Sequence, residues 1–177
     1  MNIFFLSKNW KRAAGMHCDK HCVKMLVEYA QLLSTAHRVL DGENVISEDF
    51  YKITHKNHPC AIWVRENEQH YTWLFLMFDE LSKEYTRRYG KVHASWSKLN
   101  WILGFPPHNI VQKKWEDPPQ CMPDHCKTED VVEAYRQYYI KEKSSFAKWK
   151  SGGTPKWFTK GIVMSTNTYT STIEQGI

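Results

Sequence analysis

The sequence lacks several features that would assign a protein to a class at once. No run of 18 apolar residues occurs in the 177-residue chain, so no segment is predicted to span a membrane. There is no internal repeat and no C-x-x-C pair, which excludes repeat architectures and standard zinc modules. The five cysteines follow no signal peptide. We therefore expect reduced thiols, no disulfide and a cytoplasmic location.

The charge and the aromatic content are compatible with contact to nucleic acid, although many proteins of other function share this balance. The formal net charge is +5, and aromatic residues make up 14% of the chain, with eight tryptophans and nine tyrosines. Basic side chains suit phosphate groups, and aromatic rings stack on bases. A chain of this length can bury one core. We expect one helical domain over residues 1–164 and a disordered Ser- and Thr-rich tail over residues 165–177.

Residues 16–40 are predicted to form the central helix, because they contain no proline and apolar residues cover most of the helical surface. The remaining polar positions recur every three or four residues along one line: His17, His21, Lys24, Glu28, Gln31 and Thr35. Charged groups in a buried helix are costly unless they are paired. The line is therefore either an ion pair between Lys24 and Glu28 with histidines at the helix start, or part of a reaction site.

The rest of the chain predicts further helices around one irregular loop. An apolar lead-in covers residues 1–6, and helices are expected at 59–89, with a break near Asn67, and at 95–103 and 128–149. Residues 105–126 contain five prolines and are too long for a plain connection. The predicted fold class is all-α: a compact helical single domain with a long proline-rich loop.

Three kinds of chemistry fit these residues. His17 and His21 could chelate one metal ion, with the Cys121–Cys126 segment as a second source of ligands, but Cys18 and Cys22 lie on another helical face, and we predict no metal and no cofactor. Cys60 follows His58 at a helix start, where a thiol can become a nucleophile. Glu28, seven residues after His21, could act as an acid or base or stabilise a sugar cation.

The motifs HCDKH, NHPCAIWVRE and EYTRRYGK resemble a family of small, largely uncharacterised phage proteins over about residues 1–157. More distantly, the layout resembles the pyrimidine-dimer DNA glycosylase/AP-lyases of T-even phages. His21 and Glu28 match the spacing of their histidine and catalytic glutamate. His58-Pro59 likewise precedes a long helix, and the segment from Pro155 to Gly161 is similar to one that helps to bind the substrate strand.

One position departs from the glycosylase pattern. Those enzymes attack the sugar C1′ with the freed α-amine of residue 2, whereas residue 2 here is Asn2, whose side chain is too large for efficient removal of the initiator methionine. The resemblance therefore implies either that the amine of Met1 is the nucleophile or that the imine mechanism is absent.

The resemblance implies a phage enzyme that acts on nucleic acid at the N-glycosidic bond in the host cytoplasm. Its predicted catalytic residues are Met1, His21, Lys24 and Glu28. Its predicted substrate-binding residues are His17, Gln31, His55, His58, Arg65, Arg88, Lys156, Trp157, Phe158 and Lys160. The alternatives are an enzyme or binder of a small nucleotide, such as a precursor or a host defence signal, and a non-enzymatic inhibitor of a host protein.

Overall fold

The computed structural model describes residues 1–42, 47–151 and 153–174, with the backbone alone from residue 166 onward. The fold is all-α, as predicted, and contains no strand within these residues. The elements in chain order are α1 (Trp10–Met16), α2 (Asp19–Leu40), α3 (Pro59–Glu66), α4 (Glu68–Tyr89), α5 (Ala94–Leu103), the 3₁₀ turn η1 (Asp124–Cys126), α6 (Val131–Tyr138), the π-helical turn η2 (Tyr139–Lys143) and α7 (Lys156–Glu174).

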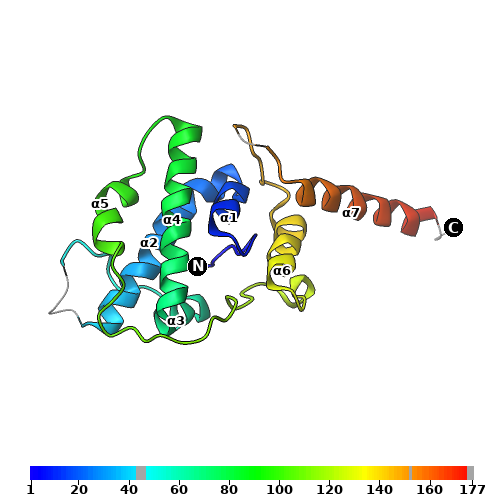
Figure 1. The fold of residues 1–177 in the computed structure, drawn as a ribbon. Coiled ribbons are helices and arrows are strands. Elements are labelled where there is room, and N and C mark those ends of the chain that lie inside the picture. The colour runs from blue at the N-terminus through cyan, green and yellow to red at the C-terminus, as the bar shows by residue number, and fades with distance from the viewer. Residues whose placement is uncertain (43–46, 152, 175–177) are drawn as a thin grey trace.

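The long helices α2 and α4 pack against each other and carry the core. Helix α1 packs on α4, and α3 and α5 pack on α2, so α2 is surrounded by helices along most of its length. The N-terminal segment also lies in this core, with Ile3, Phe5 and Leu6 fully buried. Figure 1 shows the chain start in the middle of the molecule, between α4 and α6. This burial places the N-terminal amine inside the fold.

Capping residues explain the boundaries of α3 and α4. Asn67 is the C-cap of α3 and the N-cap of α4, and its side chain accepts a hydrogen bond from the backbone N–H of Gln69. The predicted break at Asn67 is therefore confirmed. Gly90 ends α4 with φ 67°, a left-handed conformation that glycine adopts without a steric penalty.

Two predicted helix boundaries were wrong. The central helix begins at Asp19 rather than Met16, because His17 is extended and is the C-cap of α1. The helix predicted over 128–149 is shorter, since α6 ends at Tyr138 and continues as η2 to Lys143. The wider π-helical turn accompanies the burial of both Tyr139 and Ile140, which are neighbours in sequence.

The loop of 105–126 is irregular apart from η1, as its prolines predicted. The disordered tail over 165–177 stays a prediction: the backbone of 165–174 continues α7, and 175–177 lie outside the described residues. Helix α7 is anchored at its start and extends away from the other helices in Figure 1. Gly161 allows that anchoring, because a Cβ there would overlap Ile140. Within the described residues, no helix is both long and apolar enough to cross a membrane.

Candidate active site

The N-terminal amine lies beside Glu28 on α2. The nitrogen of Met1 is 4.0 Å from Oε2 of Glu28, and Nζ of Lys24 is 3.2 Å from the other carboxylate oxygen. The Glu28 side chain is 14% exposed and that of Lys24 is 64% exposed. The carboxylate therefore meets one cation from the buried chain terminus and one from the solvent side. The expected Lys24–Glu28 pair is present, and the amine shares its carboxylate.

The amine is held in place through the residues that follow it. The side-chain amide of Asn2 donates to the carbonyl of Cys121 at 2.8 Å, and its Oδ1 accepts from the hydroxyl of Tyr135 at 3.1 Å. The backbone N–H of Phe4 donates to the hydroxyl of Tyr29 at 3.3 Å. Contacts to α2, to α6 and to the proline-rich loop thus fix the first four residues over Glu28.

His17 belongs to the scaffold beneath this segment. Its Nδ1–H donates to the carbonyl of Ala13 at 2.8 Å, which leaves Nε2 to accept from the Tyr29 hydroxyl at 2.7 Å. Burial lowers the pKa of His17 to about 4, and the nearby charge of Arg88 adds to this shift. A neutral, fully buried imidazole orients Tyr29, which in turn holds Phe4. This position differs from the substrate contact that we predicted for His17.

His21 also faces the protein interior. Its Nδ1 lies 2.6 Å from the hydroxyl of Tyr139, and its ring stacks on Phe4 with centroids 4.3 Å apart. Burial, followed by the charges of His17 and Lys143, lowers its pKa to about 3. His21 therefore packs against Phe4 of the N-terminal segment, whose amine lies beside Glu28.

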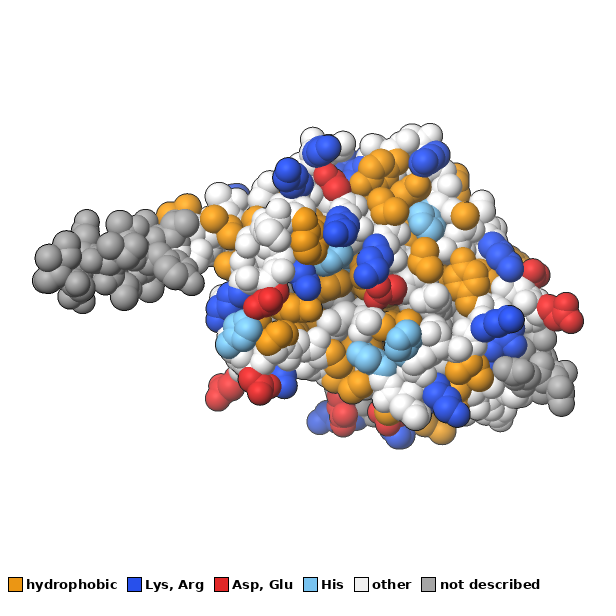
Figure 2. Space-filling view, turned by 180° about the vertical axis from the view of Figure 1, so that it is seen from behind, with side chains coloured by type: hydrophobic (Ala, Val, Ile, Leu, Met, Phe, Trp, Pro, Cys, Tyr) orange, Lys and Arg blue, Asp and Glu red, His pale blue; other side chains and the backbone are white. Residues whose placement is uncertain are grey.

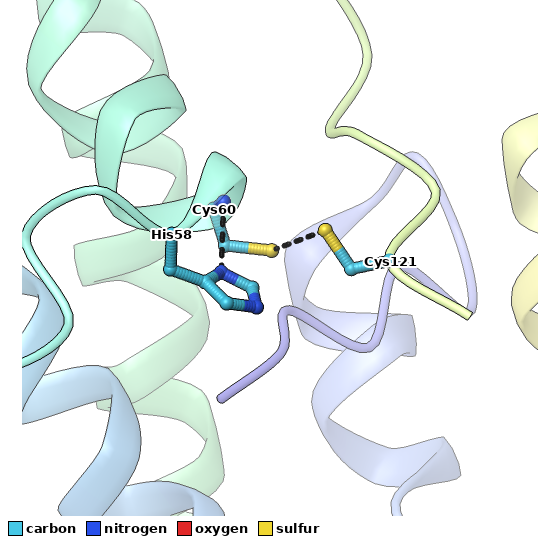
Figure 3. Close-up of side chains that lie close together, drawn as sticks. All are labelled: His58, Cys60 and Cys121. Atoms are coloured by element: carbon cyan, nitrogen blue, oxygen red, sulfur yellow. Dashed lines mark hydrogen bonds between the residues drawn. The ribbon is translucent and has the colours of Figure 1, made fainter.

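His58 and two cysteines lie on the other side of the amine. The Nδ1 of His58 caps α3 by accepting from the N–H of Cys60 at 3.1 Å. Burial and then the Met1 ammonium charge lower the pKa of His58, while Glu28 raises it, so the three groups lie within electrostatic reach of one another. Figure 3 shows His58 next to Cys60 and Cys121, whose sulfur atoms point toward each other.

The two thiols are electrostatically unequal. Cys60 donates to Sγ of Cys121 across 3.6 Å. This hydrogen bond, together with the backbone N–H of Cys60 and the Met1 ammonium charge, lowers the pKa of Cys121 to about 7 against the effect of burial. The same hydrogen bond and burial raise the pKa of Cys60. Cys121 is therefore the acidic thiol of the pair and Cys60 the protonated one.

Residues 1–98 of the chain, which include Met1, Glu28 and His58, match the pyrimidine dimer DNA glycosylase family. The chain belongs to this family. It is therefore a DNA glycosylase-like enzyme that acts on DNA. The comparisons with curated proteins and with solved structures give no match. The family match ends after the first residues of α5, so the proline-rich loop, α6 and α7 lie outside it.

Within the glycosylase-family region, Arg88 does not face the amine site. Its side chain is 1% exposed and forms ion pairs with Glu84 at 2.6 Å and Asp19 at 3.0 Å. It also donates to the carbonyls of His17 and Gly15. Arg88 therefore ties the end of α4 to the α1–α2 junction, and its donors are used within the protein rather than offered to the phosphate that we predicted.

The other predicted contacts in this region lie on α2, on α3 and in the loop before α3. Gln31 is half-buried on α2, one turn after Glu28. His55 is exposed in the loop before α3, in a left-handed conformation with φ 48°. Arg65 is half-buried and donates to the carbonyl of Lys56 at 2.6 Å, which ties this loop to α3. Both histidines of this loop reach the solvent: His55 is exposed and His58 is half-buried.

The predicted substrate contacts near the C-terminus lie on α7, where the aromatic residues are buried or half-buried and the lysines are exposed. Phe158 is buried against Trp149, with ring centroids 4.9 Å apart, and Trp157 is half-buried against Tyr139. These two aromatic rings anchor α7, which accounts for the sequence pattern without a stacked base. Lys156 and Lys160 are exposed at the start of the same helix. The lysines remain available for phosphate.

Two groups of side chains in the described residues have a donor set that suits a metal ion. One is His58, Cys60 and Cys121, and the other is His125, Cys126 and Glu142, each with ligand atoms within 4.8 Å of one another. In the first, Nδ1 of His58 already accepts the Cys60 N–H. His17 and His21 are in neither group, because each imidazole is bonded to a different tyrosine.

Asn2 and Cys121 are the residues of this site that sequence patterns did not single out. From the sequence, Asn2 mattered only because its size disfavours removal of Met1, and Cys121 was considered only as part of a possible metal-binding segment. Their contact joins residues 119 positions apart. The proline content of the loop predicted extended, irregular structure, but it did not predict that Cys121 would contact Asn2.

Proposed function

We propose that this protein is a DNA glycosylase with associated lyase activity, in which the α-amine of Met1 is the nucleophile. The observation that supports this is the 4.0 Å separation of the Met1 nitrogen from Glu28. Family membership supports DNA as the substrate. We further propose that the target is a damaged pyrimidine nucleotide and that the enzyme works in the cytoplasm of a phage-infected cell.

The neutral amine attacks C1′ of the target nucleotide, and the bond from C1′ to the base breaks with the bonding pair leaving on the base. The base takes up a proton, and the amine proton passes to O4′ as the C1′–O4′ bond breaks, which opens the sugar ring to an imine. Glu28 stabilises the positive charge that develops on the sugar and then on the imine nitrogen. Loss of a C2′ proton expels the 3′-phosphate, and water releases Met1.

Lys24 binds the second oxygen of Glu28 and so orients the carboxylate toward the amine. His55 and His58 lie in the loop before α3 and Arg65 in the last turn of α3, where it holds the carbonyl of Lys56 in that loop; these three side chains suit the phosphates that flank the target. Lys156 and Lys160 extend phosphate contact to α7. In the view from behind, Lys and Arg side chains are spread over the surface with histidines among them (Figure 2), which suits several separate phosphate contacts.

Borohydride trapping tests the nucleophile. The protein is incubated with a duplex that carries one abasic site, reduced with sodium borohydride, digested and mapped by mass spectrometry. We expect a covalent DNA adduct on the N-terminal peptide, at the α-amine of Met1. A variant with one glycine added before Met1 is the matched control, because its amine is displaced from Glu28, and it should trap little DNA.

Two results would contradict the proposal. An adduct on Lys24 with an unmodified Met1 would transfer the role of nucleophile to that lysine. Intact mass showing that Met1 is removed would transfer it to the amine of Asn2. Trapping on DNA that carries a pyrimidine dimer, compared with undamaged DNA, tests the substrate separately from the nucleophile.

A further inference from the structure

Cys60 and Cys121 are a thiol pair whose sulfur atoms are already in contact. Cys60 lies in the first turn of α3 and Cys121 lies 61 positions later in the proline-rich loop, and their Sγ atoms are 3.6 Å apart. A disulfide has an S–S length of about 2.05 Å, so the sulfurs must approach by roughly 1.5 Å. Cys121 lies between Pro119 and Pro123 in irregular structure. A loop can make this movement more easily than a helix.

Exposure and protonation give the two thiols different roles. Cys121 is partly exposed, whereas Cys60 is fully buried behind it. With a pKa of about 7, roughly half of the Cys121 side chains are thiolates at neutral pH. Cys60 holds a proton and points it at Cys121. An oxidant can thus reach Cys121 first, and Cys60 is placed to react second.

We propose that Cys121 and Cys60 form a reversible disulfide on exposure to a peroxide, and that this disulfide lowers the activity of the amine site. The Cys121 thiolate displaces hydroxide from hydrogen peroxide and becomes a sulfenic acid. The Cys60 thiol then attacks that sulfur, and water leaves as the S–S bond forms. A dithiol reverses the reaction by exchange, and the protein thiols are regenerated. The effect on activity, but not the disulfide itself, rests on the proposed function.

Asn2 connects the thiol pair to the amine. Its Nδ2 donates to the carbonyl of Cys121 at 2.8 Å, and its Oδ1 lies 3.8 Å from Sγ of Cys60. A disulfide removes the Cys60 S–H and pulls the Cys121 backbone toward α3, so both contacts of Asn2 change. Asn2 is one peptide bond from the Met1 amine. Oxidation therefore displaces the nucleophile from Glu28.

The geometry favours thiol oxidation over metal binding at this cluster. A metal bound by His58, Cys60 and Cys121 needs a lone pair from the imidazole, but Nδ1 of His58 is the acceptor for the Cys60 N–H at 3.1 Å. The neutral ring then carries its proton on Nε2. The Sγ atom of Cys60 also lies 3.8 Å from Oδ1 of Asn2, but the two sulfur atoms face each other at the shorter distance of 3.6 Å (Figure 3).

The test treats the full-length, reduced protein with one equivalent of hydrogen peroxide. Intact mass should show the loss of two hydrogens, peptide mapping should join Cys60 to Cys121, and dithiothreitol should restore the original mass. C60S and C121S should each fail to form this disulfide. C126S is the matched control, because Cys126 is a buried cysteine at the end of the same loop, and it should react like the wild type.

Activity is measured in parallel as borohydride trapping of abasic DNA. Oxidation should slow trapping by on the order of 10- to 100-fold, since displacement of a reacting group by about 1 Å has effects of this size. C60S and C121S should trap DNA at the same rate before and after peroxide. The mass measurement does not depend on catalysis. If the disulfide forms in a protein that has no trapping activity, the proposed function is contradicted and the proposed thiol reaction is not.

Three results would overturn the inference: a mapped disulfide between other cysteines, stable sulfinic acid at Cys121 with Cys60 still free, or a wild-type disulfide without any change in trapping by an active enzyme. One zinc per chain that C60S and C121S both lose would also overturn it, because the thiols would then be metal ligands.

Discussion

At the residue scale, the carboxylate of Glu28 has one oxygen for each of two cations, and the two contacts predict different mutant behaviour. The contact with Lys24 joins a partly buried carboxylate to a side chain that is 64% exposed, and such pairs contribute at most about 1 kcal/mol to the free energy of unfolding. The contact with Met1 lies at the buried chain terminus. The Lys24 contact therefore contributes little to stability, and we propose that the Met1 contact serves the reaction.

Replacement of Glu28 by glutamine should keep the size of the side chain and remove its charge. We expect borohydride trapping to fall by about 10²–10⁴-fold, as for other acid–base residues, with a melting temperature close to that of the wild type. Trapping kinetics and calorimetry measure the two effects on the same preparation.

Glu80→Gln is the matched control, since Glu80 pairs with Lys83 at 3.0 Å on α4 and its side chain is 20% exposed. It should change neither quantity. If E28Q lowers the melting temperature strongly and trapping only in proportion to the unfolded fraction, Glu28 is structural and the catalytic role is lost.

At the scale of elements, aromatic residues at the start of α7 anchor the helix, and lysines on the same helix carry charge at the surface. Its first turn buries Phe158 and exposes Lys156 and Lys160, so the lysines project from a firmly packed helix start. A polymer substrate releases counterions at each phosphate that a lysine contacts, whereas a small nucleotide does not reach such a distant pair. The salt dependence of binding therefore distinguishes a polymer ligand from a small nucleotide.

Replacement of both Lys156 and Lys160 by alanine should reduce the slope of log K against log salt by about two for duplex DNA. Fluorescence anisotropy with a labelled duplex from low to physiological salt measures this slope. Lys83→Ala is the control, because Asp79 and Glu80 already neutralise that lysine, and its slope should equal the wild-type value.

The opposite pattern would favour the small-nucleotide alternative. In that case DNA would not bind even at low salt, a mononucleotide would bind at micromolar concentration, and the lysine pair would have no effect. Binding would instead depend on Arg65 and His58.

At the scale of the whole molecule, buried histidines make the folded state sensitive to acid. His17 and His21 have folded pKa values of about 4 and about 3, both below the ordinary value of 6.5. The unfolded chain therefore binds more protons between pH 6.5 and these values. Stability from this source is complete above pH 6.5 and is lost as the pH falls, at about 1.4 kcal/mol per pH unit and per histidine.

Lowering the pH from 7 to 5 should thus cost about 2 kcal/mol of unfolding free energy for each of these histidines. Urea denaturation at the two pH values measures the loss. His21→Gln should show a smaller loss than the wild type. An equal loss in both proteins would mean that the imidazole of His21 is not held neutral.

Much of the fold follows from local sequence patterns. The break at Asn67 and the end of α4 at Gly90 depend on capping residues and backbone conformation, which act within a few positions. The spacing of Glu28 and Lys24 likewise predicted an i, i+4 pair that the structure contains. The anchoring of the start of α7 was not predictable from composition, because it depends on how Phe158 and Gly161 pack against residues of other elements.

The sequence by itself determined the all-α class, most helix boundaries and the place of Glu28 on a central helix, because periodicity and capping are local. Only the tertiary structure decided that His17 and His21 face tyrosines and that Arg88 faces Glu84. It also decided that Met1 reaches Glu28, and that Asn2 joins a cysteine 119 positions away. A helical face is readable from spacing, but the group that packs against it comes from distant segments, whose contacts depend on the closure of the whole core.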